Sequence, residues 1–226
     1  SKIYKDRQNG QPSSIQAEHK SWVGIGWTMH MGRMYNPDSS NPIIEFPDGR
    51  RETLYSDIYG TGKLINRDFL KYDKANNKLY FKNGVIWTFG KSTTVFFGDG
   101  TSKPTRLVTS IQNSYGHSIT ITYKTWPLLL TRPVISKIVD SMGREINFTS
   151  TDEEYPKLQK ITIKNTTGSN VDYIYSVNTF PNGFYKLESF QKPVIPTSFY
   201  QYYDNSYELK TITTEYGGTI EYAYGD

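Results

Sequence analysis

The sequence predicts an all-β protein built from consecutive antiparallel hairpins, and three observations lead to this fold class. Aromatic residues make up 15% of the chain, with 19 Tyr and 11 Phe, and these residue types suit a pleated, half-buried surface. Apolar and polar residues alternate over short runs, as in strands with one buried face. Helical periodicity is hard to find anywhere. With 226 residues, the chain is long enough for one large or two small domains.

The first element is a polar N-terminal segment, residues 1–20, which lacks the apolar centre of a signal peptide. We interpret it as a fragment boundary or a mature end. The stretch VGIGWTMHMGRMY follows, with glycines at 24, 26 and 32. A dinucleotide-binding loop needs G-x-G-x-x-G between a strand and a helix, and neither this spacing nor a helical pattern is present. We therefore expect Gly24, Gly26 and Gly32 to bend a strand or to let an aromatic ring lie across the backbone.

The next elements are short strands joined by turns. The runs Lys78–Phe81 and Val85–Phe89 flank Lys82-Asn83-Gly84. Asn-Gly between alternating runs predicts a hairpin, because both residues tolerate a positive φ angle. A further strand, Val95–Phe97, leads into a turn at 98–100.

From about residue 107 the chain repeats a hairpin-sized unit. Each unit opens with a branched apolar residue, two other residues, and Ile or Phe; the openings are Val108–Ile111, Ile135–Ile138, Leu158–Ile161, Leu187–Phe190 and Leu209–Ile212. Turns with glycine follow at 113–116, 140–143, 165–168 and 215–218, and the fourth unit turns through Pro193 and Pro196. Each second strand closes on an aromatic residue: Tyr123, Phe148, Tyr173 with Tyr175, Tyr200 with Tyr202, and Tyr222 with Tyr224. The anchor residues recur every 22 to 29 positions, so each unit is predicted to be one hairpin.

Hairpins in series have a physical consequence for the fold. An isolated hairpin is marginally stable in water, so each must pair with or stack on the next. The expected result is a long strip of sheet or a solenoid. The last unit stops at Asp226 without a polar cap, which suggests an array cut from a longer one.

The wording of the repeats resembles a known family. The segments RLVTSIQNSYGHSITITY (106–123), VISKIVDSMGREINF (134–148) and LKTITTEYGGTIEYAY (209–224) are similar to the Rhs or YD-repeat family, which includes bacterial Rhs toxins, the BC component of Tc toxins and the teneurins. The residues that carry the likeness are turn glycines, a following arginine and closing tyrosines: Gly116, Gly143, Arg144, Gly217, Gly218, Tyr222 and Tyr224. The opening stretch, with Trp27 and Arg33, is similar to the start of such shells and to SpvB-like regions.

The resemblance implies a fold and a role. Such arrays form a spiralling sheet that closes into a hollow β-shell around a polypeptide, often a toxic C-terminal domain. This chain would be a structural, non-enzymatic section of the wall, with non-repeat strands at 21–103 and hairpin repeats at 104–226 continuing the same sheet. Its partners would be the rest of the parent shell and the enclosed domain, in a protein that is secreted or at the cell surface. The self-cleaving aspartates of the family have no counterpart here, and Tyr-Asp, the dipeptide that names the repeat, occurs only at 72–73 and 203–204.

Several kinds of chemistry find little support in the sequence. Cysteine is absent, which excludes disulfides, thiolate nucleophiles and zinc sites of the Cys type. His19, His30 and His117 are far apart, and the acidic run at 152–154 lacks a calcium-ligand pattern, so we expect no cofactor and no metal. The net charge is +4, with basic residues spread along the chain, unlike a nucleic-acid-binding face. No apolar run approaches the length of a transmembrane helix.

Two other functions remain open at this stage. The tyrosines and Trp22, Trp27, Trp87 and Trp126 could form a sugar-stacking face of an extracellular carbohydrate- or cell-surface-binding module, although their placement at strand ends favours packing between hairpins. A glycoside hydrolase would require two carboxylates in one cleft, and nothing in the sequence marks such a pair. For a shell wall that encloses an unfolded chain, we expect the inner face to be polar and rich in tyrosine.

Overall fold

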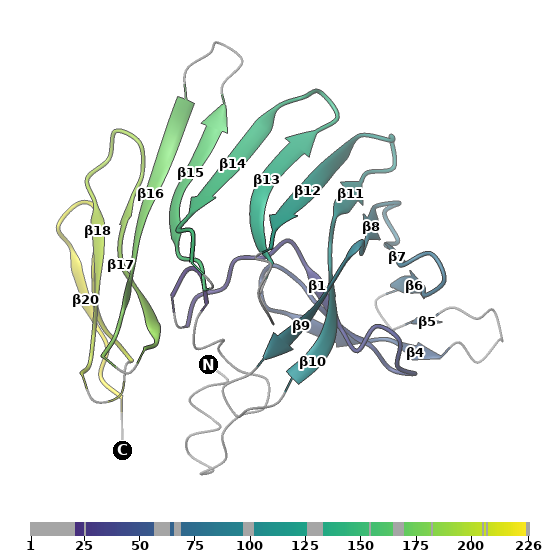
Figure 1. The fold of residues 1–226 in the computed structure, drawn as a ribbon, viewed down its shortest axis with the longest axis horizontal. Helices are drawn as coiled ribbons and strands as arrows, with labels where there is room; N and C mark the ends of the chain where they lie inside the picture. Colours follow the sequence, from purple (N-terminus) through teal and green to yellow (C-terminus); the bar gives the residue numbers. More distant parts are fainter. Residues whose placement is uncertain are drawn as a thin grey trace.

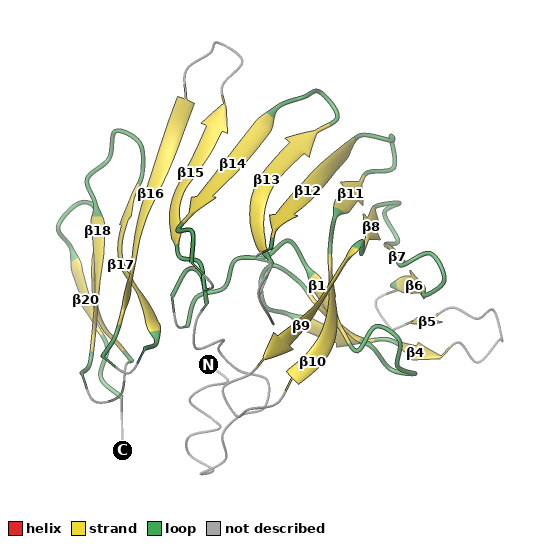
Figure 2. Ribbon diagram, in the orientation of Figure 1, coloured by secondary structure: helices red, strands yellow, loops and turns green. Residues whose placement is uncertain are grey.

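A computed structural model shows an all-β chain with its strands in two antiparallel sheets (Figures 1 and 2). The structure describes residues 21–24, 26–56, 64–65, 69–96, 102–125, 133–153, 155–164, 170–181, 183–204, 206 and 208–224. These residues contain no helix, and hence none long and apolar enough to cross a membrane. The prediction of an all-β, hairpin-rich fold is confirmed.

The smaller sheet has five strands in the order β3-β2-β1-β10-β9. Its strands are β1 (Arg33–Tyr35), β2 (Ile43–Glu45), β3 (Arg51–Thr53), β9 (Lys91–Phe96) and β10 (Ser102–Leu107). The predicted boundary between residues 103 and 104 falls inside β10, which pairs with both β1 and β9.

The larger sheet has fifteen strands in the order β20-β19-β18-β17-β16-β15-β14-β13-β12-β11-β8-β7-β6-β5-β4. Its first strands are short: β4 (Tyr55–Ser56), β5 (Leu64–Ile65), β6 (Lys71–Asp73), β7 (Lys78–Tyr80) and β8 (Ile86–Thr88). The remaining strands are β11 (Ser110–Gln112), β12 (Ser118–Lys124), β13 (Val134–Asp140), β14 (Glu145–Ser150), β15 (Leu158–Lys164), β16 (Asn170–Thr179), β17 (Tyr185–Gln191), β18 (Ser198–Tyr202), β19 (Leu209–Thr213) and β20 (Thr219–Glu221). Figure 1 shows that this sheet arches over the smaller one.

From β11 to β20 each strand pairs with the strand that follows it in the chain. The predicted units therefore coincide with the hairpins β11–β12, β13–β14, β15–β16, β17–β18 and β19–β20. The turn predicted at 165–168 and the one at 98–100 lie outside the described residues. The last strand is shorter than the predicted run to Tyr224, because β20 ends at Glu221.

Several hairpins share one turn geometry, which the predicted turn at Asn83-Gly84 illustrates. The Phe81 N–H donates to the Val85 carbonyl (2.9 Å), and the Gly84 N–H donates to the Phe81 carbonyl (3.0 Å). Gly84 has a φ of +79°, as expected for a three-residue loop that ends in a left-handed glycine. Asn83 does not share the positive φ; its Oδ1 accepts a hydrogen bond from the Val85 N–H (3.2 Å). The hairpin was predicted correctly, but the role of the asparagine differs.

The core lies between the two sheets. Strand pairing places isoleucine and aromatic side chains on one face of the large sheet, which we call the inner face; its residues include Tyr72, Leu79, Trp87, Ile121, Ile138, Ile146, Phe148, Ile161, Tyr173, Tyr175, Phe190, Tyr200, Ile212 and Ile220. Residues of the smaller sheet and its flanks, such as Met34, Ile44 and Leu54, are fully buried against the first part of this face. Burying apolar area in this way stabilises the fold by about 25 cal/mol per Å².

Candidate functional site

The inner face of the large sheet is the surface on which the N-terminal residues pack. Its composition differs from our expectation, since isoleucine is at least as frequent as tyrosine and polar side chains are few. The expected tyrosines are present on this face, but the expected polar character is not found where the N-terminal layer covers it. The physical reason is that residues 21–54 cover the face over β6 to β15 and need apolar surface there.

The opening stretch of the sequence runs across this inner face. We call residues 21–24 and 26–32 the crossing segment; they are irregular and lead into β1. The Leu158 N–H donates to the Trp22 carbonyl (2.8 Å), which ties the segment to the start of β15. The Trp22 ring lies 6.1 Å from that of Phe148 on β14. The segment thus interacts with the sheet through its backbone as well as its side chains.

Glycines allow the close contacts of the crossing segment. A Cβ atom at Gly24 would lie 2.5 Å from the Leu187 nitrogen on β17, and one at Gly32 would lie 2.5 Å from the Trp87 ring. Gly24, Gly26 and Gly32 all have positive φ angles. The expected close approach of an aromatic ring is confirmed at Gly32. The expected bent strand is not present, because β1 begins only at Arg33 and the glycines lie in the turns and irregular chain before it.

Trp27 anchors the segment at its far side. Its ring packs edge-on against Tyr200 with a centroid distance of 5.3 Å. Burial raises the pKa of Tyr202 to about 12, although a hydrogen bond with the Trp27 side chain acts against this rise. Trp27 is 38% exposed, whereas Trp22 and Trp87 are buried, and Trp126 lies outside the described residues. The tryptophans therefore do not gather on one exposed face among the residues that the structure describes.

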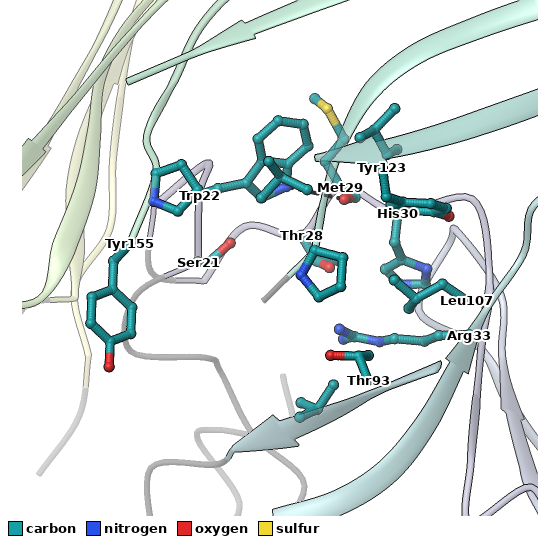
Figure 3. Close-up of a pocket in the computed structure, with 15 residues that line it drawn as sticks. Ser21, Trp22, Thr28, Met29, His30, Arg33, Thr93, Leu107, Tyr123 and Tyr155 are labelled. Carbon is teal, nitrogen blue, oxygen red and sulfur yellow. Dashed lines mark hydrogen bonds between the residues drawn. The ribbon is translucent and has the colours of Figure 1, made fainter. Parts of the chain in front are cut away.

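Beside the crossing segment lies a small cavity of about 60 Å³ (Figure 3). The polar side chains that line it come from the segment, from β1, β9 and β12, and from the stretch before β15: Ser21, Thr28, His30, Arg33, Thr93, Tyr123 and Tyr155. A volume of this size holds a few water molecules, and it is several times smaller than the roughly 300 Å³ that small-molecule sites start from. We therefore do not assign a sugar or nucleotide to it.

A buried carboxylate, Glu45, binds two of the residues that line this cavity, His30 and Arg33. It accepts hydrogen bonds from Arg33 (3.0 Å), Arg51 (2.7 Å), Tyr35 (2.9 Å) and His30 (3.2 Å). We call these five residues the Glu45 cluster. Burial acts to raise the pKa of Glu45, but the His30 hydrogen bond and the charges of Arg33 and Arg51 hold it well below its usual range.

Strand pairing explains why these charges meet. Arg33 on β1 lies directly opposite Glu45 on β2, which lies directly opposite Arg51 on β3, and opposite charges facing each other across strands attract. The His30 Nδ1 accepts the Gly32 N–H (3.0 Å), so its Nε2 carries the proton donated to Glu45. Both carboxylate oxygens of Glu45 are paired, and the cluster fixes the entry of the crossing segment into β1.

The sequence alone does not predict this cluster. Arg33 carries the likeness to shell entrances, and for His30 the sequence indicates only that it has no second histidine nearby in the chain. Glu45 was not noticed, although an acidic residue inside the apolar run PIIEF is a signal of a buried, paired charge. Among the described residues Glu45 is the one buried carboxylate, and no group of three or more His, Cys, Asp or Glu is placed to hold a metal ion.

The closing tyrosines of the repeats have a structural role that the sequence did not reveal. In each of three hairpins, a tyrosine hydroxyl donates to the backbone carbonyl of the residue 15 positions earlier, where the hairpin starts. The pairs are Tyr123 with Val108 (2.6 Å), Tyr202 with Leu187 (3.0 Å) and Tyr224 with Leu209 (2.9 Å). We call this contact the tyrosine clamp. It ties the end of each hairpin to its beginning. Tyr222 contributes differently, since its carbonyl accepts from the Tyr203 hydroxyl (2.8 Å).

The turn residues of the motif act locally. The Asp140 carboxylate accepts from the backbone N–H groups of Met142 and Arg144 and from the Arg144 side chain (2.6 Å). Gly116, Gly143 and Gly217 take positive φ angles in their turns, and the Gly218 carbonyl accepts from the Thr214 N–H (2.7 Å). These residues make contacts within their own turns and stabilise individual hairpins.

Comparison with known proteins adds one distant likeness. No family model matches the sequence, and no curated protein does. Among solved structures, the chain is similar to the N-terminal domain of the effector protein SpvB from Salmonella typhimurium strain LT2, with a TM-score of 0.39 and 12% sequence identity over 93% of this chain and 92% of that one. A TM-score of this size does not establish a shared fold.

Proposed function

We propose that the chain is a structural section of an Rhs/YD-repeat-type β-shell that encloses a polypeptide such as a toxin domain. The observation that carries this proposal is the crossing segment, an irregular stretch of polypeptide that lies along the inner face of an arched sheet. It is tied to β15 through its backbone and packed closely against β17. Contacts of the backbone type do not depend on the sequence of the bound chain. An enclosed polypeptide could use the same mode further along the sheet.

The inner face beyond the crossing segment is where such a chain would lie. Tyr173 and Phe190 stack with a centroid distance of 6.3 Å and are only partly buried, as is Ile212. Ile220, at the end of the face, is 49% exposed. Apolar surface left open in this way is normally covered by a partner. The rest of the parent shell and the enclosed chain are the partners we propose, in a protein that is secreted or at the cell surface.

A matched pair of cysteine variants tests this proposal, because the natural chain contains no cysteine. Ile220 points to the inner face and its neighbour Glu221 to the outer face, and both are exposed. A maleimide should label Ile220→Cys more slowly when a reduced and alkylated, permanently unfolded polypeptide is added. Labelling of Glu221→Cys should not change. Equal rates for both variants, with and without the polypeptide, would remove the support for an enclosing face.

The alternative is an extracellular carbohydrate- or cell-surface-binding module. One observation favours it, namely that Trp27 is partly exposed beside the ring of Tyr200, since aromatic faces stack on sugars. A glycan array probed with the full chain and with Trp27→Ala distinguishes the two functions. Binding of a defined glycan that is lost in the variant would support this module over the shell. We propose no catalytic activity for the chain.

A further inference from the structure

Exposed apolar side chains lie at the tips of several hairpins, on the side of the large sheet where its strands end in turns. We call this side the edge; it is not an edge strand. Because successive strands alternate in direction, the turns after β11, β13, β17 and β19 lie along the same edge (Figure 1). Tyr115, Met142, Val194 and Tyr216 sit in these turns and are 87%, 76%, 105% and 83% exposed. We call these four the rim residues. Isolated exposed apolar residues are common, but Tyr115, Met142 and Tyr216 occupy the same position of the same kind of turn. This regularity calls for an explanation.

Turn chemistry does not require these side chains. The turns Phe46–Arg50 and 81–85 have the same hydrogen-bond geometry as the rim turns that carry Tyr115, Met142 and Tyr216. The Val194 turn differs, since there the Ile195 N–H donates to the Lys192 carbonyl (3.4 Å). At the position equivalent to Tyr115 and Met142, the turns Phe46–Arg50 and 81–85 carry Asp48 and Asn83, whose side chains accept a backbone N–H two residues later. A short polar residue is therefore the stabilising choice at this position.

The rim turns obtain the same stabilisation from a different residue. In two of them, Asn113 and Asp140 at the start of the turn accept the backbone N–H groups that close it. The middle position is thus free of any role in the turn, and tyrosine or methionine occupies it. What these apolar side chains contribute must lie outside the hairpin.

Val194 supports the same conclusion from backbone strain. Its φ angle is +59°, a conformation that is strongly unfavourable for a β-branched residue. Glycine or asparagine would relieve the strain. The strain is located at a turn tip whose side chain is fully exposed, and strained residues of this kind concentrate at functional positions.

The charges around the rim residues do not oppose approach to an anionic surface. The described rim turns and the adjacent turn at 81–85 contain three cations, Lys82, Arg144 and Lys192, and two carboxylates, Asp140 and Glu215. Both carboxylates are ion-paired, Asp140 with Arg144 (2.6 Å) and Glu215 with Lys192 (2.9 Å). The turns therefore carry a net charge of +1 and present no uncompensated carboxylate.

Spacing distinguishes a lipid surface from a protein partner. Neighbouring strands are about 4.8 Å apart, so the tips of successive hairpins are about 10 Å apart. Side chains at such intervals do not form the contiguous patch that a stable protein interface needs. Each one can, however, enter the interfacial layer of a bilayer separately, where tyrosine is favoured.

We propose that this edge is a peripheral membrane-contact site, at which the rim residues insert into the headgroup region of an anionic bilayer. The site is separate from the inner face, and the proposal does not depend on the shell function. The binding is additive over weak contacts, as for other interfacial anchors. Tyrosine and methionine contribute apolar area while the paired charges around them remain in water.

Co-sedimentation of the full 226-residue chain with vesicles tests the site. The vesicles contain phosphatidylcholine with about 30% phosphatidylserine, a composition that gives an anionic surface. The triple variant Tyr115→Ser/Met142→Ser/Tyr216→Ser should reduce the vesicle partition coefficient about tenfold. The matched control, Ile174→Ser/Phe199→Ser, removes two exposed apolar residues from the outer sheet face and should bind like the unsubstituted chain.

A second measurement keeps the test informative if the triple variant does not fold. An environment-sensitive dye on Met142→Cys should shift to the blue on adding the anionic vesicles, whereas the same dye on Phe199→Cys should not. The proposal is overturned if the unsubstituted chain does not bind these vesicles, or if both dyes respond alike. It is also overturned if the rim residues instead control dimerisation, measured by light scattering after size exclusion.

Discussion

At the scale of single residues, Gly32 shows how closely the crossing segment and the sheet approach. A Cβ atom there would lie 2.5 Å from the Trp87 ring, whereas one at Gly26 would meet nothing within 4 Å. Both glycines have positive φ angles, so alanine adds about 1 kcal/mol of backbone strain at each site. Gly32→Ala should lower the free energy of unfolding by a further 2 kcal/mol or so, because Trp87 must move within a packed core.

Urea unfolding of Gly32→Ala and Gly26→Ala measures this difference directly. The Gly26 variant is the matched control, since it carries the strain without the clash. Equal destabilisation of the two variants would mean that Trp87 adjusts freely and that the close packing at Gly32 is not important.

Glu45 predicts a pH dependence of stability. Its pKa in the folded chain lies well below the ordinary value of 4.5. The unfolded chain therefore takes up the proton first as the pH falls, and the stabilisation that is present above about pH 4.5 is lost progressively below it. Glu45→Gln should lower the free energy of unfolding by about 3 kcal/mol at pH 7, because Arg33 and Arg51 lose their buried counter-charge.

The difference between Glu45→Gln and the unsubstituted chain should shrink as the pH approaches 3. Chemical unfolding at a series of pH values gives this difference. Other carboxylates with lowered pKa values, such as Asp140 and Asp172, are present in both proteins and cancel in the comparison. A difference that stays constant from pH 7 to pH 3 would contradict the assignment.

At the scale of the element, the tyrosine clamp explains why the repeats close on tyrosine. Removing the hydroxyl leaves a backbone carbonyl without its partner, and the cost rises with burial. Burial raises the pKa of Tyr123 strongly, while Tyr224 is 39% exposed. We expect Tyr123→Phe to cost about 2 kcal/mol of stability and Tyr224→Phe about 0.5 kcal/mol or less, with Tyr202→Phe between them.

Thermal unfolding of the three Phe variants gives the order of the effects. Phe148, which closes the second hairpin without a hydroxyl, shows that a hairpin can form with an aromatic ring alone. A reversed order, with Tyr224→Phe the most destabilising, would show that the clamp does not depend on burial as proposed.

Most of the hairpins could be predicted from the sequence, because their signals are local. Alternation marks the strands, and turns such as Asp140–Arg144 contain both the glycine and the side chain that stabilises them. The Glu45 cluster, in contrast, depends on residues that lie on three different strands. The row Arg33, Glu45 and Arg51 forms only when three strands take one register, and no local pattern encodes that register. The covered inner face was mispredicted for the same reason, since the layer that covers it comes from residues 21–54.

At the scale of the whole molecule, the N-terminal layer covers the inner face of the large sheet unevenly. Residues such as Leu79, Ile121 and Leu158 are buried beneath the N-terminal layer, while Ile212 and Ile220 near the other end are not. Segments with few buried apolar contacts open at a lower free energy. Backbone amides of β19 and β20 should therefore exchange with deuterium sooner than those of β11 to β14, in a measurement by mass spectrometry. Uniform protection along the sheet would contradict this gradient.

The order of the strands also determines how the molecule responds to force. Each strand from β11 onward bonds to the one that follows it, so tension on the C-terminal end would unzip one pair at a time. Each released hairpin of 22 to 29 residues adds about 75–100 Å of chain. The crossing segment contacts β17 and β18 through Gly24 and Trp27. An optical trap should therefore record the release of β19 and β20 at low force, and the release of β17 and β18 at a higher force. The crossing segment would thus resist the removal of strands from the C-terminal end of the sheet.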